Sequence, residues 1–290
     1  MNGIIIIDKP QEWTSNDVVS RLRRVFNTRR IGHGGTLDPM ATGVLPVFVG
    51  RATRGVEFFE HAQKVYETTI RFGLTTDTED ITGKTLTETE VHLTEDDLLN
   101  VLPKFRGDIL QVPPMYSAIK VNGQKLYDLA RKGREVERQA RSITIHELEL
   151  LDFAGNEARL RVRCSKGTYI RTLCKNIGEA LGCGGCMAQL RRVEAGEYTL
   201  EGSIPLRQLL DISEAGEDVE HLLRPVDTMF ASHPSLKLNE KQARLVKNGN
   251  AFSEHCPDGT YRVYAPSGEF LALCSAEGGK VSTIKSFFEV

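Results

Sequence analysis

A glycine-rich segment built around one carboxylate carries the clearest chemical potential in this chain. Residues 32–43 read GHGGTLDPMATG, and their four glycines allow tight turns and close approach to a ligand. Pro39 restrains the residue before it, Asp38, to extended conformations. The pattern predicts an acidic side chain on a stiffened loop, with Thr36 and Thr42 beside it as hydrogen-bonding partners. An acidic side chain held on a stiff loop is typical of a nucleophile or general base.

The spacing alone also fits a turn in which Asp38 only bonds the local backbone, as aspartate often does. The segment is not a phosphate-binding loop of the GxxxxGK[ST] kind, because no Lys-Ser/Thr pair follows its glycines. It does not match GxGxxG either, since Leu37 occupies the position of the last glycine. The chemistry of this loop therefore depends on its carboxylate.

The segments on either side of the loop predict the elements that hold it. The apolar run at residues 4–7 predicts a buried strand that Pro10 stops, and residues 44–49 predict a second one. Between them residues 14–17 (TSND) offer N-cap chemistry, and apolar side chains then recur at helical spacing: Val18, Leu22, Val25 and Phe26. The helix leads directly into the Asp38 loop. Further along, residues 64–73 alternate and place Tyr66 on one side of a strand.

Basic side chains gather in two places. Residues 21–30, on the first helix and its exit, hold five arginines and no acidic residue, and residues 159–175 hold six basic residues and no acidic one. A charge run is usually a solvated face. Because the formal net charge is only −2, the distribution of charge matters more than its total for a nucleic-acid partner. The segment 159–175, with Arg161 and Arg163, is the better candidate for an RNA-facing surface.

Other features limit the class of protein. The run at residues 4–7 is shorter than a signal-peptide core of roughly 7–15 residues, and nothing approaches a membrane span, so a cytoplasmic protein is expected. The six cysteines are expected to be reduced. Cys183 and Cys186 have metal-like spacing but no second pair, so they are interpreted as incidental, with a metal or redox role as the minor alternative.

Five strings outside the loop resemble one family. They are GIIIIDKP (residues 3–10), KVY (64–66), VPPMYSA (112–118), KGTYIR (166–171) and LRR (190–192). With the Asp38 loop, they resemble the TruB family of tRNA pseudouridine-55 synthases, in the right order, from Gly3 to about Gly196. The last unit, of about 55 residues, is similar to the small β-rich RNA-binding module of the PUA type that such synthases often carry.

The resemblance implies an α+β fold. The catalytic domain would have a mixed, mainly antiparallel sheet of the pseudouridine-synthase type with flanking helices, and a small β-rich PUA-like module would follow it. The expected division is residues 1–230 for the catalytic domain and 231–290 for the RNA-binding module. The family converts uridine in the T-arm of tRNA to pseudouridine, a reaction that requires no cofactor and no metal.

The resemblance also implies roles for individual residues. Asp38 would be the single catalytic carboxylate, either attacking the anomeric carbon or removing a ribose proton to give a glycal. Arg171 would pair with Asp38 and favour its charged form. Tyr66 would stack on the flipped uracil and help remove the C5 proton. Tyr169 and Leu190 would line the base pocket, and His33 would contact RNA or wedge against the loop.

Two other interpretations stay open. A non-catalytic tRNA-binding or RNA-folding protein would use the same surface. A guide-RNA-dependent relative would need protein partners and often carries Lys-rich tails, whereas this chain has neither long tails nor Lys-rich runs. We therefore expect a stand-alone bacterial enzyme that acts as a monomer on the tRNA T-arm, with no obligatory protein partner and no membrane attachment.

Overall fold

The computed structural model describes residues 1–121 and 123–289. Its central feature is a ten-stranded mixed sheet in the order β14-β1-β3-β12-β4-β11-β10-β7, with β13 on β12 and β2 on β3. The strands are β1 (Gly3–Lys9), β2 (Ile31–His33), β3 (Thr42–Val49), β4 (Lys64–Phe72), β7 (Gly107–Gln111), β10 (Arg141–Ala154), β11 (Glu157–Cys164), β12 (Gly185–Ala195), β13 (Tyr198–Thr199) and β14 (Ile204–Pro205). Within the described chain, pairing in this sheet is parallel only at β1–β14 and β3–β12. The predicted mixed, mainly antiparallel sheet is confirmed.

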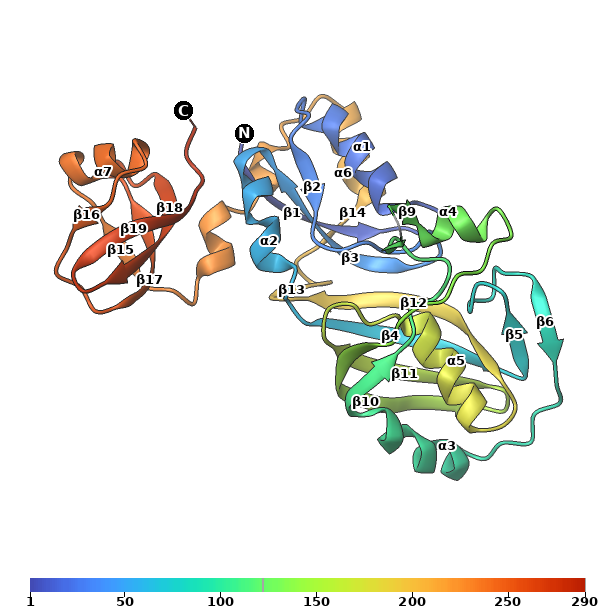
Figure 1. The fold of residues 1–290 in the computed structure, drawn as a ribbon. Helices are drawn as coiled ribbons and strands as arrows, with labels where there is room; N and C mark the ends of the chain where they lie inside the picture. The colour runs from blue at the N-terminus through green and yellow to red at the C-terminus, as the bar shows by residue number, and fades with distance from the viewer. Residues whose placement is uncertain (122, 290) are drawn as a thin grey trace.

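The sheet consists of two halves that meet at a short junction. β1, β2, β3 and β14 form one half, and β4, β7, β10, β11 and β12 form the other (Figure 1). Strands β4 and β11 pair from Lys64 to Arg71. By contrast, β12 and β3 pair only through Arg191 with Thr42 and Arg192 with Gly43. The two halves of the sheet are therefore joined by a backbone connection of only two residue pairs.

Helices and helical turns flank the sheet. They are α1 (Ser15–Val25), α2 (Val56–Phe59), α3 (Glu95–Val101), α4 (Leu126–Ala130), α5 (Ile170–Ala180), α6 (Leu206–Glu214), α7 (Glu240–Lys247), and the 3-10 turns η1 (Gly50–Gly55), η2 (Leu102–Phe105), η3 (Glu220–Leu222) and η4 (Val226–Phe230). Helix α1 begins at the predicted cap, where Thr14 and Asp17 form a reciprocal capping box. Helix α5 packs on β12 and β4 and ends before Gly182, which has a φ of 77°.

One apolar core holds both halves together. It runs from Ile5, Val18 and Leu45 in the first half to Leu160 and Ile177 in the second. Burial of such side chains supplies the main stabilising free energy, at about 25 cal/mol for each Å² of apolar surface removed from water. The narrow backbone junction is thus supplemented by packing.

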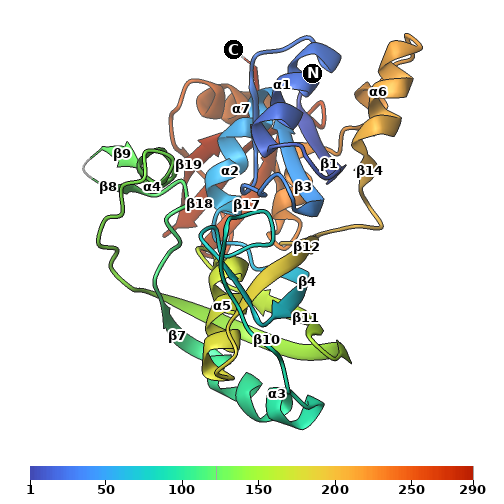
Figure 2. The ribbon, with the colours of Figure 1, turned by 90° about the vertical axis from the view of Figure 1, so that its right-hand side faces the viewer.

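Two hairpins lie outside the main sheet. Strands β5 (Leu74–Thr76) and β6 (Thr85–Glu88) form one, and β8 (Lys120–Val121) and β9 (Gln124–Lys125) form the other. Figure 2 shows the β8–β9–α4 segment projecting to one side of the sheet. The loop between β5 and β6 returns to the sheet, where Ile81 N–H donates to the Met187 carbonyl in β12 at 2.9 Å.

The C-terminal residues form a separate small sheet. Its order is β15-β17-β18-β19-β16, built from β15 (Ser235–Lys237), β16 (Phe252–Ser253), β17 (Gly259–Tyr264), β18 (Phe270–Glu277) and β19 (Lys280–Ser286). With α7 it encloses its own core, which includes Leu238, Val246, Val263 and Val281. Phe287 and Leu273 pack instead with Phe230 and Phe59 and connect this module to the larger one.

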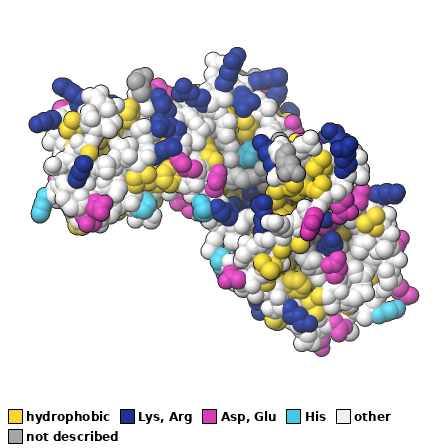
Figure 3. Space-filling view, in the orientation of Figure 1, with side chains coloured by type: hydrophobic (Ala, Val, Ile, Leu, Met, Phe, Trp, Pro, Cys, Tyr) yellow, Lys and Arg dark blue, Asp and Glu magenta, His cyan; other side chains and the backbone are white. Residues whose placement is uncertain are grey.

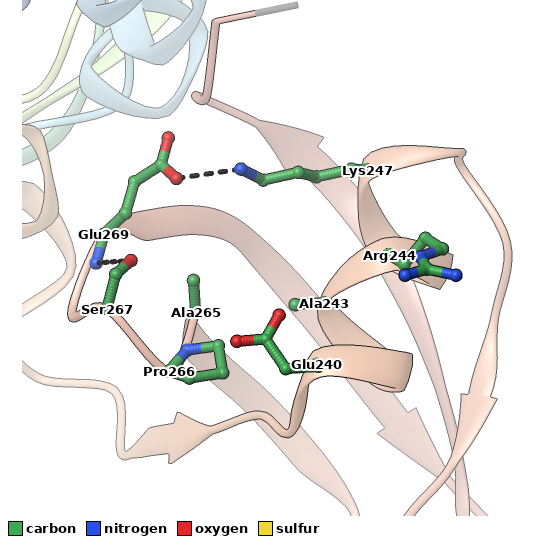
Figure 4. A pocket seen from close by; sticks show the side chains of 8 residues that line it. All are labelled: Glu240, Ala243, Arg244, Lys247, Ala265, Pro266, Ser267 and Glu269. Carbon is green, nitrogen blue, oxygen red and sulfur yellow. Dashed lines mark hydrogen bonds and ion pairs between the residues drawn. The ribbon is translucent and has the colours of Figure 1, made fainter.

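A pocket of about 370 Å³ lies on this module, between α7 and the turn that follows β17. Figure 4 shows the Lys247–Glu269 ion pair, whose N–O distance is 2.9 Å, at its margin. The pocket is distant in sequence from the Asp38 loop.

None of the helices in the described chain is long and apolar enough to cross a membrane.

Candidate active site

Asp38 and Arg171 form an ion pair between the two halves of the sheet. Arg171 Nε lies 3.0 Å from Asp38 Oδ2, and the arginine side chain is 6% exposed while the aspartate is 34% exposed. The guanidinium also donates to the Thr78 carbonyl at 3.2 Å and to the Tyr116 carbonyl at 2.8 Å. Three fixed acceptors therefore orient Arg171, and the carboxylate remains within reach of a ligand.

The loop that carries Asp38 is anchored at both ends. Ser15 Oγ accepts a hydrogen bond from Leu37 N at 2.8 Å, and Gly34 N donates to the Pro46 carbonyl at 2.8 Å. Gly35 and Gly43 have φ values of 108° and 102°, which a residue with a side chain rarely adopts. The expected stiff mounting thus comes from backbone conformation and from α1.

The predicted hydroxyl partners of Asp38 lie elsewhere. Thr42 Oγ1 accepts from Arg191 Nη1 at 3.2 Å, and Thr36 is exposed. Asp38 has Arg171 as its charged partner instead. The expectation that Thr36 and Thr42 would flank the carboxylate is wrong, because Thr42 is already in β3 and its side chain turns toward β12.

Lys9 holds the backbone of the Asp38 loop by hydrogen bonds, a role that the sequence did not reveal. Its ammonium is completely buried and donates to the carbonyls of Trp13 at 2.6 Å, Pro10 at 2.9 Å and Pro39 at 3.3 Å. Burial lowers the pKa of Lys9 to about 8, and the nearby Asp38 carboxylate opposes this shift. Pro39 directly follows Asp38, so Lys9 fixes the backbone at the carboxylate.

Tyr66 comes from the same half of the catalytic region as Arg171, since α5 packs on β12 and β4. It is 9% exposed in β4, where it faces Val162 of β11 on one side and Arg192 of β12 on the other. Burial raises the pKa of the Tyr66 hydroxyl and the Arg192 guanidinium opposes this rise, while Asp38 is close enough to add to it. Tyr66 therefore offers a neutral hydroxyl and an aromatic ring beside the ion pair.

Tyr169, Leu190 and His33 surround this centre. Tyr169 caps α5, and its backbone N–H and carbonyl are both bonded by the Gln111 amide, at 2.8 and 3.0 Å. Leu190 is 9% exposed in β12, two residues before Arg192. His33 ends β2, and its Nδ1 is buried without a hydrogen-bond partner. Burial, and then Arg192, lowers the pKa of His33, so its ring is neutral near pH 7.

The predicted RNA-facing stripe is neutralised by acidic partners. Arg159 pairs with Glu67 at 2.6 Å, Arg161 with Glu194 at 3.0 Å, and Arg163 with Glu194 at 3.2 Å. These arginines alternate with Leu160 and Val162, which are buried under α5, so they lie on the opposite face of the sheet from Tyr66. Arg161 and Arg163 are thus ion-paired on the face away from Tyr66, and their assignment to an RNA-facing surface stays a prediction.

Other Lys and Arg side chains gather over the C-terminal module, α1 and α4 along one side of the molecule (Figure 3). Cys183 Sγ donates to the Gly184 carbonyl at 3.3 Å, and it and Cys186 are free thiols. Among the described residues, no group of three or more His, Cys, Asp or Glu side chains is arranged to hold a metal ion.

The same fold occurs in solved RNA-modification complexes. A Cbf5-Nop10-Gar1 complex contains a chain that is 27% identical, with a TM-score of 0.73 over 99% of this chain and 85% of that one. An H/ACA RNP bound to a substrate RNA containing 2′-deoxyuridine gives the same TM-score at 25% identity, again over 99% and 85% of the two chains. The fold and the family models that match this chain define the class of the protein: it is a pseudouridine synthase.

The family follows from the sequence matches. The model described as "TruB family pseudouridylate synthase (N terminal domain)" matches residues 23–170, and two TruB C-terminal models match residues 171–231 and 233–288. A tRNA pseudouridine synthase B of Pseudomonas fluorescens (strain Pf0-1) is 45% identical over 97% of this chain and 94% of its own length. One of Stutzerimonas stutzeri (strain A1501) is 44% identical over the same shares. The chain belongs to the TruB family and is a tRNA pseudouridine synthase.

Proposed function

We propose that this enzyme isomerises uridine-55 in the T-arm of tRNA to pseudouridine, with Asp38 as its single catalytic carboxylate. One observation supports this most directly: Asp38 is paired with a nearly buried arginine at 3.0 Å and stays one-third exposed beside Tyr66 and Tyr169. A reactive group needs this combination of fixed orientation and access.

The reaction leaves the elemental composition of the nucleoside unchanged. The bond between ribose C1′ and uracil N1 breaks, the uracil turns, C1′ bonds to C5, and the C5 proton is lost while N1 gains one. Asp38 either attacks C1′, forming a covalent ribose adduct, or removes the C2′ proton to give a glycal. Arg171 engages Oδ2 and leaves Oδ1 for the ribose in both routes.

The remaining side chains fit a flipped base. A uridine within a loop has to leave its stack to meet Asp38, and an aromatic ring compensates for the stacking that is lost. Tyr66 provides this ring and a neutral hydroxyl near C5. Tyr169 and Leu190 are proposed to line the pocket, and His33, on the rim of the Asp38 loop, to contact the RNA that surrounds the vacated position.

We further propose that residues 231–290 form an accessory RNA-binding module and residues 1–230 the catalytic domain. The separate apolar core around Val263 and the Lys and Arg side chains visible over this module in Figure 3 support the proposal. A tRNA substrate implies a cytoplasmic location, and a complete site within one chain implies that a monomer acts without an obligatory protein partner.

The experiment uses the purified chain and an unmodified tRNA transcript. Carbodiimide treatment and primer extension should map one pseudouridine, at position 55. Asp38→Asn should keep tRNA binding and abolish tritium release from [5-³H]uridine-labelled tRNA. Unchanged tritium release in this variant would exclude Asp38 as the catalytic group. Activity only after addition of a guide RNA or a protein partner would exclude the stand-alone assignment.

A further inference from the structure

Two consecutive arginines, Arg191 and Arg192, lie where the two halves of the main sheet meet. Their backbones pair with Thr42 and Gly43, and among the described strands no other ladder joins the halves. A parallel ladder of two residue pairs is a weak connection. A Cβ at Gly43 would lie 2.1 Å from the Arg192 carbonyl oxygen, so the strands approach closely only because residue 43 is glycine.

Arg192 reinforces the junction on the face that carries the active site. Its guanidinium donates to the Val44 carbonyl at 2.7 Å and to the Gly35 carbonyl at 3.1 Å. The side chain is 1% exposed, and it forms no ion pair within the described part of the chain. A buried charge is destabilising unless its hydrogen bonds are satisfied. One of its carbonyls belongs to β3 and the other to the loop that carries Asp38.

Arg191 reinforces the same junction on the opposite face, because successive strand residues point to opposite sides. Its Nη2 donates to Asp8 Oδ2 at 2.8 Å, and its Nη1 donates to Thr42 Oγ1 at 3.2 Å. Asp8 belongs to β1 and Thr42 to β3. The two arginines therefore connect β12 to β1, β3 and the Asp38 loop.

The proposed catalytic groups are divided across this junction. Asp38 follows β2 in the first half, whereas Tyr66 and Arg171 come from β4 and α5 in the second. The 3.0 Å contact between Asp38 and Arg171 therefore spans the two halves. A rotation of one half relative to the other would change this distance and would displace Asp38 from the base-stacking ring.

We propose that Arg191 and Arg192 are positioning residues that clamp the two halves of the sheet and so set Asp38 relative to Tyr66 and Arg171. The proposal rests on the assignment of Asp38 as the catalytic carboxylate. Neither arginine has to touch the substrate, since Arg192 is buried and Arg191 bonds Asp8 and Thr42.

The first test is Arg192→Lys, which keeps the charge but cannot donate to both carbonyls with the fork of a guanidinium. We expect the single-turnover rate of pseudouridine formation to fall about 100-fold, because a displacement of about 1 Å has such an effect. The Kd for a T-arm hairpin should stay near the wild-type value. A folded variant with wild-type rate would overturn the proposal, as would a loss of rate that only matches a loss of binding.

The only tryptophan provides a second readout. The Lys9 ammonium that bonds the Trp13 carbonyl also bonds the Pro39 carbonyl of the Asp38 loop. Loosening of this loop in Arg192→Lys should make Trp13 fluorescence more susceptible to acrylamide quenching. Arg71→Lys is the matched control, because Arg71, near the far end of β4, bonds Asn156 and Glu157 at the start of β11, away from the junction. Unchanged quenching in the folded Arg192→Lys variant would contradict the clamp.

A double-mutant cycle on Arg191 and Asp8, on the opposite face of the sheet, tests the clamp if Arg192→Lys fails to fold. Arg191→Gln and Asp8→Ala both remove the bond between these side chains, so each should slow the single-turnover rate and the double variant should be no slower than the worse single one. Additive losses, or no loss, would overturn the clamp. Absence of pseudouridine formation by the wild-type protein would instead refute the proposed function, and Trp13 quenching would still test the clamp.

Discussion

Thr172 Oγ1 donates to Glu79 Oε2 at 2.6 Å, and this bond ties the β5–β6 loop to the first turn of α5. Lys175 pairs with the other oxygen of Glu79 at 3.1 Å. The Glu79 backbone has a φ of 65°, a left-handed conformation that costs a non-glycine residue about 1–2 kcal/mol. The contacts to α5 offset this strain. Because the neighbouring Thr78 carbonyl accepts from Arg171, Glu79 helps to orient the partner of Asp38.

Replacement of Glu79 by alanine should therefore slow catalysis without removing any group that touches the substrate. We expect the single-turnover rate to fall about 10-fold, less than the about 100-fold effect of a displacement of about 1 Å. The free energy of unfolding should decrease by about 2 kcal/mol, since the hydrogen bonds that the buried Glu79 carboxylate accepts from Thr172 and Lys175 are lost. Stopped-flow or quench kinetics and urea unfolding would measure the two effects.

Glu79→Gly separates the carboxylate from the backbone strain. It loses the same contacts but accepts the left-handed conformation, so it should be more stable than Glu79→Ala and equally slow. Recovery of the wild-type rate by glycine would show that strain, rather than the bond to Thr172, controls Arg171. Glu179→Ala, which removes an exposed carboxylate of α5, should leave the rate unchanged.

Arg171→Lys tests how much the geometry of the ion pair contributes beyond its charge. A lysine ammonium could approach Asp38, but it could not also bond the Thr78 and Tyr116 carbonyls in the planar arrangement seen for Arg171. We expect the rate to fall at least about 100-fold while tRNA binding changes little. Single-turnover kinetics with saturating enzyme would measure this rate. A near-wild-type rate would mean that a nearby positive charge is sufficient.

The sequence predicted the Asp38 loop and the strands around it because their signals are local. The Pro39 restraint on Asp38, the cap at Thr14 and the alternation around Tyr66 each depend on residues within a few positions, and β4 (Lys64–Phe72) matches the predicted segment closely. The motif strings also located Arg171, whose pairing with Asp38 the structure shows.

The residues that the sequence missed act through long-range contacts. Lys9 and Arg192 are charged side chains in strand patterns, where a charge usually indicates exposure, yet both are buried against backbone carbonyls from other segments. Alternation placed Arg161 and its neighbours on one face correctly. It could not reveal that Glu67 and Glu194, on two other strands, neutralise them.

The free energy of unfolding should depend on pH in alkaline solution because Lys64 is buried. Burial lowers the pKa of Lys64 to about 8 in the folded protein, with Arg192 adding to the effect, from 10.5 in the unfolded chain. Between pH 8 and 10.5 the unfolded state binds more protons at this group, so its contribution to stability rises with pH. The slope is at most about 1.4 kcal/mol per pH unit for one proton.

Lys64→Met isolates this contribution. Urea unfolding of both proteins from pH 7 to 10 should show a more positive slope for the wild type above pH 8, and parallel curves below it. The variant also loses the bond to the Ala62 carbonyl at 2.6 Å, which shifts its curve without changing its shape. Parallel curves throughout this range would show that the pKa of Lys64 is not lowered.

Charge reversal at Arg161 distinguishes an RNA-binding surface from an internal charge network. Arg161 bridges Glu67 at 3.3 Å and Glu194 at 3.0 Å on the face of the sheet that points away from Tyr66. Arg161→Glu should therefore leave tRNA affinity and its salt dependence close to wild type, because no phosphate contact is lost. It should lower the melting temperature instead, since three carboxylates would then lie side by side. Arg24→Glu, on the exposed face of α1 and free of an acidic partner in the described chain, is the comparison for a candidate phosphate contact. A tRNA affinity that falls more for Arg161→Glu than for Arg24→Glu would support the β11 stripe as the RNA-facing surface.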